Sequence, residues 1–150
     1  MPETFTIEGF FNGPLVARGV VLDWRGRAIR RLEATMHGSW DGPRGTLVED
    51  FTYDDGERAQ RTWHITAIPG GRYTGTAGDI VGTAHGRLVG HGEARWAYTM
   101  TMPIGGRPVR FAFDDRMYAV GTAGVINRAV IRKWGVPVAS LVLWIERGAR

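Results

Sequence analysis

Several charged side chains lie where an alternating strand would place them among bulky apolar residues. Glu49 shares the period-two spacing of Phe51 and Tyr53, and Arg61 shares that of Trp63. Charge on a buried strand face is costly unless it is paired or meets a ligand. Glu49 and Arg61 therefore form either a structural ion pair, or a site in which Arg61 holds an anionic head group and Glu49 orients it.

The same pattern recurs later in the chain. The bulky face carries further polar residues (Tyr98, Asp115, Asn127, Lys133 and Ser140) beside Trp96 and Phe113. One interpretation is acid–base chemistry, with Glu49 or Asp115 as the base and Tyr98 or Arg61 stabilising an oxyanion. The other is structural: Asp115 would cap a strand end with Asp114, and Lys133, the only lysine, would extend to water.

Most familiar catalytic and cofactor sites have no counterpart here. The chain has no cysteine, and its four histidines show no metal-ligand spacing, so we expect no metal site and no cofactor. A haem-binding barrel needs a single histidine, but nothing selects one of the four. The glycine-rich segment 75–86 lacks phosphate-loop spacing, and we expect a kinked strand in which Asp79 bonds backbone amides. No basic patch interleaved with aromatic residues points to nucleic acid.

Turn residues divide the chain into short alternating runs. Asp54-Asp55-Gly56, Pro69-Gly70-Gly71 and Gly105-Gly106 separate such runs at hairpin spacing. They predict about ten antiparallel strands, among them 73–77, 87–91 and 108–115. The expected fold is all-β: one up-and-down barrel of lipocalin or calycin type over residues 1–150, with a two-sheet sandwich as the alternative. Residues 1–13 would form a lid or short helix, with Phe10 and Phe11 as plugs.

Composition and charge narrow the class of protein further. The chain has 150 residues, 43% of them hydrophobic, and a net charge of +4, which is typical of one globular domain. The N-terminal segment does not resemble a signal peptide, and no apolar run approaches the roughly 20 residues that a membrane-spanning helix needs. These features favour a cytoplasmic protein.

Several segments together resemble the DUF3833 family. They are Glu49–Gly56 with Arg61-Thr62-Trp63, then Gly75–Ala84, Phe113–Tyr118, Asn127–Ala129 and Lys133–Gly135. The resemblance implies a lipocalin-like barrel from a bacterium, and it suggests a lipid ligand, but it implies no assigned activity. Many family members look like lipoproteins, whereas this chain has no lipobox cysteine. The family's recurrent polar positions fall on Glu49, Arg61, Asp79, Asp114, Asp115, Asn127, Arg128 and Lys133.

These observations favour a binding protein for a small hydrophobic or fatty-acid-like molecule. Its apolar tail would lie inside the barrel and its polar end would meet Arg61, together with Tyr98 or Lys133. The expected ligand-binding residues are Arg61, Trp63, Tyr98, Phe51, Tyr53, Trp96, Phe113, Asn127 and Lys133. The alternatives are an acid–base enzyme that acts on a lipid or polyketide-like substrate through Glu49 or Asp115, and a structural protein with a filled barrel.

Overall fold

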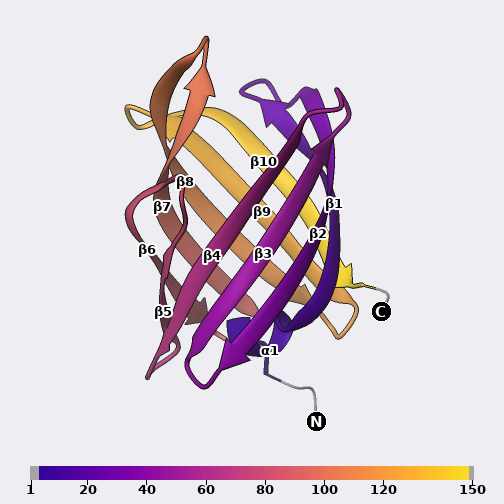
Figure 1. Cartoon of the computed structure of the whole chain (residues 1–150), viewed down its shortest axis with the longest axis vertical. Helices are drawn as coiled ribbons and strands as arrows, with labels where there is room; N and C mark the ends of the chain where they lie inside the picture. The colour runs from indigo at the N-terminus through magenta and orange to yellow at the C-terminus, as the bar shows by residue number, and fades with distance from the viewer. Residues whose placement is uncertain (1–3, 149–150) are drawn as a thin grey trace.

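The computed structural model describes residues 4–148 as one closed antiparallel barrel (Figure 1). A single short helix, α1 (Ile7–Phe10), precedes the strands. The strands are β1 (Gly13–Asp23), β2 (Ala28–Asp41), β3 (Arg44–Tyr53), β4 (Arg58–Ile68), β5 (Arg72–Thr76), β6 (Ile80–Val89), β7 (Glu93–Ile104), β8 (Arg107–Val120), β9 (Gly124–Lys133) and β10 (Val136–Arg147).

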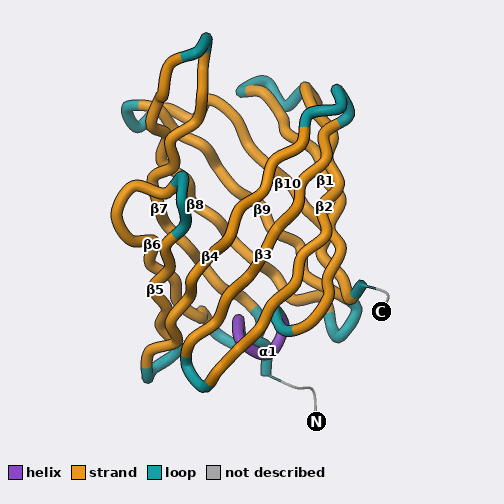
Figure 2. The backbone as a smooth tube through the Cα atoms, in the orientation of Figure 1, coloured by secondary structure: helices purple, strands orange, loops and turns teal. Residues whose placement is uncertain are grey.

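Each strand pairs with its neighbours in sequence, and β1 pairs with β10 to close the sheet. This is the predicted up-and-down barrel, and it rules out the two-sheet sandwich because the strand order is one continuous ring. Tight turns join the strands at both ends, as the smooth backbone trace shows (Figure 2). At five of them a glycine with positive φ lies in the hairpin turn: Gly26, Gly56, Gly70, Gly105 and Gly135.

Helix α1 closes one end of the barrel. Thr6 caps the helix, because its hydroxyl accepts a hydrogen bond from the Gly9 amide at 3.0 Å. Ile7 and Phe11 are buried in the core, and Trp40 Nε1 donates to the Phe11 carbonyl at 2.9 Å. The expected lid is therefore a short helix followed by a plug, although residues 1–3 of that segment lie outside the described range.

The interior is packed differently along the barrel axis. Toward α1 the inward residues are almost completely buried, with Leu15, Ala17, Ala94 and Ile145 at most 1% exposed. Toward the other end some inward residues are buried, such as Met100 and Ile131, but others are only half-buried. We call this region the open half, after its half-buried members: Tyr53, Arg61, Trp63, Tyr98, Met102, Phe111 and Leu141. The α1 end is thus a filled core, whereas solvent reaches these seven side chains of the open half.

The wall of the open half has a seam between β4 and β5. Their ladder runs only from His64↔Thr76 to Ile68↔Arg72, so residues 58–63 of β4 pair with β3 alone. A hollow of about 540 Å³ lies along the seam, and Arg61, Thr62, Ala77, Gly78 and Asp79 are among its lining residues. The seam gives solvent a second approach to the side chains of Arg61 and Asp79.

Two sequence expectations are wrong in detail. Strand β8 continues to Val120, so Asp115 lies inside a strand and does not cap its end. Ser140 faces outward, because its ladder neighbours Val130 and Leu22 lie on the outer face, while Leu141 and Leu143 point inward. A bulge between Pro137 and Ala139 shifts the register of β10, and period-two counting from the strand start does not detect it.

The contact between β2 and the plug gives a first prediction. A Cβ at Gly38 would overlap the backbone oxygen of Phe11, so Gly38→Ala must displace the plug. We expect a loss of about 1–3 kcal/mol in the free energy of unfolding, measured in urea. Gly92→Ala at the same end is the control, since the nearest atom to its added Cβ is 3.9 Å away. Equal effects of the two changes would contradict this account of the plug.

Candidate functional site

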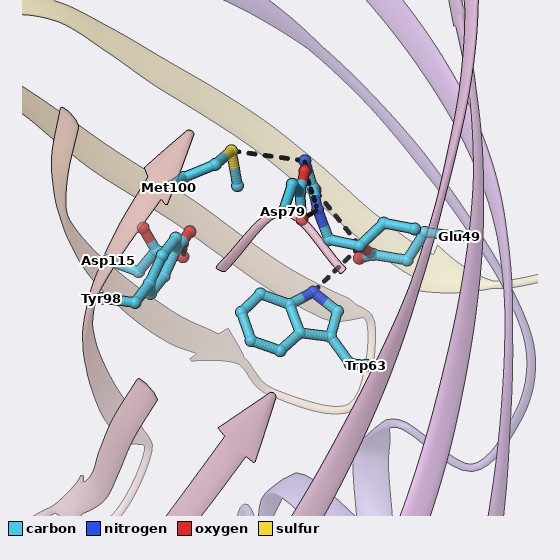
Figure 3. A network of polar contacts seen from close by, with 7 residues as sticks. Glu49, Trp63, Asp79, Tyr98, Met100 and Asp115 are labelled. Atoms are coloured by element: carbon cyan, nitrogen blue, oxygen red, sulfur yellow. Dashed lines mark hydrogen bonds and ion pairs between the residues drawn. The ribbon is translucent and has the colours of Figure 1, made fainter. Parts of the chain in front are cut away.

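A cluster of charged side chains lies in the open half, where Arg61 contacts three of the residues labelled in Figure 3, Glu49, Asp79 and Met100. Arg61 Nε and Nη2 donate to the Asp79 carboxylate across the seam at 2.9–3.1 Å. Arg61 Nη1 lies 3.6 Å from Glu49 Oε1 on the facing strand β3, and Nη2 lies 3.4 Å from Met100 Sδ. The predicted pairing of Glu49 and Arg61 is confirmed, but the guanidinium is already held mainly by Asp79.

Asp79 is the cluster member whose role the sequence did not predict. We expected it to bond backbone amides at a kink, but its carboxylate binds the Arg61 side chain. Residues 61 and 79 are brought together because β5 is short and its turn folds back beside β4. Burial lowers the pKa of Arg61, but the hydrogen bonds to Asp79 and the charge of Glu49 outweigh it and raise this pKa.

Glu49 is buried inside the barrel. Burial raises its pKa to about 7, against the opposing effects of the Arg61 charge and of the hydrogen bond from Trp63. That bond runs from Trp63 Nε1 to Glu49 Oε1 and is 3.1 Å long. Glu49 therefore exchanges its proton near neutral pH, unlike an ordinary surface carboxylate.

A second buried carboxyl lies on β8. Asp115 is 6% exposed, and the Tyr98 hydroxyl donates to its Oδ2 at 2.8 Å. Burial raises the pKa of Asp115 to about 7, although the Tyr98 hydrogen bond opposes this shift. The pKa of Tyr98 is also raised, first by burial and then by the Asp115 charge, so the tyrosine remains a hydrogen-bond donor.

Two buried acceptors in this region have no partner among the described residues. They are Asp115 Oδ1 and Asn127 Oδ1, and Asn127 is 7% exposed. Both side chains face inward on neighbouring strands, since Asp115 pairs with Ala129 and Asn127 pairs with Met117. This diagonal spacing places them on one patch of the wall. Unpaired buried acceptors in a folded protein call for an explanation, and a bound donor is one.

Aromatic and sulfur-containing side chains surround these polar groups. Tyr98 stacks on Phe113 at 5.2 Å between ring centroids and contacts Trp63 edge-on at 5.4 Å. Trp63 in turn lies 6.4 Å from Trp96, and Phe51 stacks on Tyr53 at 6.5 Å. Six of the predicted ligand-binding residues thus form an aromatic wall: Phe51, Tyr53, Trp63, Trp96, Tyr98 and Phe113. A seventh, Arg61, places its guanidinium carbon 5.3 Å from the Phe51 ring centroid.

Lys133 lies apart from this group. Its Nζ donates to the Arg110 carbonyl at 2.7 Å near the end of β9, and it packs 4.9 Å from the Trp134 ring. The side chain thus extends to the rim, as the structural interpretation expected. Among the described residues no three His, Asp or Glu side chains are grouped to hold a metal ion.

Comparison with known proteins identifies the family. The model of the family described as "Protein of unknown function (DUF3833)" matches residues 1–147. The chain belongs to this family. Among curated proteins none matches the sequence. The DUF3833 barrel is similar to the solved structure of the S-type phycobiliprotein lyase CPES from Guillardia theta, with a TM-score of 0.69 and 7% identity over 97% of this chain and 94% of that one.

At this low identity the lyase structure shows a shared fold and nothing finer. It confirms the lipocalin-like barrel that the alternating runs predicted. In residues 4–148 of the DUF3833 barrel, no helix is both long and apolar enough to cross a membrane.

Proposed function

We propose that the open half of the barrel binds a small hydrophobic ligand whose polar end donates hydrogen bonds to Asp115 and Asn127. The observation that carries the proposal is the pair of unpartnered acceptors, Asp115 Oδ1 and Asn127 Oδ1, beside an aromatic wall. An amine, with two or more N–H groups, would satisfy both oxygens, whereas a hydroxyl or a single N–H group would satisfy one of them. The stacked rings of Tyr98 and Phe113 would contact the apolar body.

The charges of the site favour a ligand that donates a hydrogen bond over a ligand that carries a negative charge. Glu49, Asp79 and Asp115 supply three carboxyl groups, against the single guanidinium of Arg61. Arg61 is held by Asp79 in a two-nitrogen contact, so a ligand carboxylate would have to displace that pair. In our proposal a fatty acid therefore binds as the neutral acid, with its O–H as the donor, and alcohols and amines bind more readily.

A second candidate function is acid–base catalysis on the same ligand. The observation that favours it is that Glu49 and Asp115 both have a pKa raised to about 7, in the range where a carboxyl serves as a general acid or base. Tyr98 would donate to a developing oxyanion while it bonds Asp115. Turnover of a bound lipid or polyketide-like molecule that stops in Glu49→Gln or Asp115→Asn would establish this function.

Matched alkyl compounds test the binding proposal. We expect 1-decanol to bind at least about 10-fold more tightly than decyl methyl ether at pH 7, because only the alcohol donates a hydrogen bond. Isothermal titration calorimetry measures both affinities. The difference should vanish in Asp115→Leu and persist in Asp114→Leu, since Asp114 faces outward, 3.6 Å from Arg132.

The two parts of the proposal fail in different ways. If neither compound binds a folded protein, hydrophobic ligand binding in the barrel is wrong. Equal affinities for the alcohol and the ether would support hydrophobic binding in the barrel but show that the ligand does not need to donate a hydrogen bond. Tighter binding of decanoate than of decanol at pH 8 would show that the site prefers an anionic head group, which contradicts the preference for a hydrogen-bond donor.

A further inference from the structure

Large apolar side chains are exposed at the open end of the barrel. Trp134 is 90% exposed and Trp24 is 69% exposed, and each lies in a hairpin turn at that end. Ile29, Ile104 and Val136 are also more than half exposed. These five residues come from three hairpins, β1–β2, β7–β8 and β9–β10, which are consecutive around the barrel because β1 pairs with β10 and β8 pairs with β9. We call these three turns the apolar rim (Figure 1).

Trp134 occupies a hairpin-turn position whose backbone conformation disfavours a bulky side chain. Trp134 is the one non-glycine residue with positive φ (51°) in the described part of the chain. Asparagine or glycine would adopt this conformation at lower cost, and a bulky residue there is rare. The indole packs against no core residue, so fold stability does not explain it. Strain of this kind persists at sites that serve binding.

Basic side chains accompany the apolar ones. The three turns, taken as residues 23–29, 102–109 and 132–137, contain five basic residues and one acidic residue, for a net charge of +4: Arg25, Arg27, Arg107, Arg132 and Lys133 against Asp23. Arg25 lies 4.7 Å above the Trp24 ring and Lys133 lies 4.9 Å from the Trp134 ring. The single acid is occupied locally, because Asp23 Oδ1 accepts the backbone amides of Arg25 and Arg27.

The other side of the same end has the opposite character. The β3–β4 turn carries Asp54, Asp55 and Glu57, and the β5–β6 turn carries Asp79. Arg30 is drawn toward this side by Asp55 and Glu57, at 3.1 and 3.6 Å. The open end is therefore divided into an acidic sector and an apolar, basic sector, which gives any contact with a charged surface one fixed orientation.

We propose that the apolar rim docks on the surface of an anionic lipid bilayer. Tryptophan side chains favour the boundary between head groups and acyl chains, and arginine and lysine beside them are attracted to anionic head groups. Three turns with their apolar tips in one sector would enter the interface together, while the acidic sector stays in water. This docking would turn the open end toward the membrane, and it does not depend on what the interior binds.

Co-sedimentation with lipid vesicles tests the docking. We expect the full chain to bind vesicles of phosphatidylcholine with 30% phosphatidylglycerol at least about 10-fold more strongly than pure phosphatidylcholine vesicles, and 0.5 M NaCl should remove most of this preference. Trp24→Ser/Trp134→Asn should lose about 10-fold or more of the binding. Asparagine suits the left-handed backbone at position 134, so this variant should fold at least as well as the wild type.

Matched variants distinguish binding through the apolar rim from non-specific adsorption of the protein to vesicles. Val120→Ser/Ile126→Ser removes two exposed apolar side chains elsewhere on the barrel and should bind vesicles like the wild type. Arg25→Gln/Arg107→Gln should weaken binding to the anionic vesicles, whereas Arg72→Gln/Arg87→Gln, outside the rim, should not. Equal binding by the rim and control variants would overturn the proposal. The proposal would also be overturned if the folded wild type bound neither vesicle type, or if sedimentation velocity showed that it dimerises through the rim.

Discussion

Arg61→Ala should lower the free energy of unfolding by about 3–5 kcal/mol at pH 8. The substitution leaves the buried Glu49 carboxylate without its cation and frees Asp79 at the seam, and neither group gains another partner. A buried charge that has lost its partner costs more than the original pair contributed. Urea denaturation followed by circular dichroism measures the change.

Two controls make this prediction specific. Arg58→Ala, on the outer face of the same strand, should change the stability by less than about 0.5 kcal/mol. In a Glu49→Gln/Asp79→Asn background, Arg61→Ala should lower the free energy of unfolding much less, because neutral amides have replaced the two carboxylates that pair with the guanidinium. A loss below about 1 kcal/mol in the original protein would show that solvent at the seam already screens the cluster.

Asp115→Asn should stabilise the protein relative to the wild type as the pH rises from 4 to 8. The folded protein raises the pKa of Asp115 from 3.8 to about 7, so the native state holds this proton more tightly than the unfolded chain does. The stability that the Asp115 proton gives the wild type is fully present below pH 3.8 and is lost as the pH rises through 7. Asp115→Asn does not lose this contribution, so its advantage over the wild type grows with pH. The difference should reach about 4 kcal/mol at pH 8, and the Asn oxygen still accepts from Tyr98.

Unfolding curves of the two proteins at pH 4, 6 and 8 measure this effect. Asp114→Asn serves as the control, since Asp114 is on the outer face and should show no such trend. Parallel pH profiles for the wild type and Asp115→Asn would mean that Asp115 is ionised in the native state and that water reaches it freely. Glu49→Gln should show a similar trend, reduced by the nearby Arg61 charge.

The sequence predicted the barrel because the physics behind it is local. Alternating runs and glycine turns determine strands and hairpins, and hairpins of this number close on themselves to remove free edges. The facing of Glu49 and Arg61 followed from the same period of two across the Asp-Gly turn. Helix α1 was one of the two alternatives, a lid or a short helix, that the sequence left open for residues 1–13.

The remaining features depend on contacts that no local pattern contains. Asp79 meets Arg61 only because β5 is five residues long, which opens the wall beside β4. The outward position of Ser140 depends on a bulge in β10. The unpartnered state of Asp115 Oδ1 and Asn127 Oδ1 is a property of the whole neighbourhood, because it requires knowing that no donor from any strand reaches them.

The most direct test of ligand binding inside the barrel is the indole N–H spectrum of ¹⁵N-labelled protein titrated with 1-decanol. The six tryptophans report separate places: Trp63 and Trp96 inside, Trp40 at the plug, Trp24 and Trp134 on the rim, and Trp144 beside Glu146. We predict saturable shifts of the Trp63 and Trp96 signals, with Trp40 and Trp144 unchanged. Shifts confined to Trp24, Trp134 or Trp144, with Trp63 unmoved, would place the alcohol outside and contradict a ligand site within the barrel.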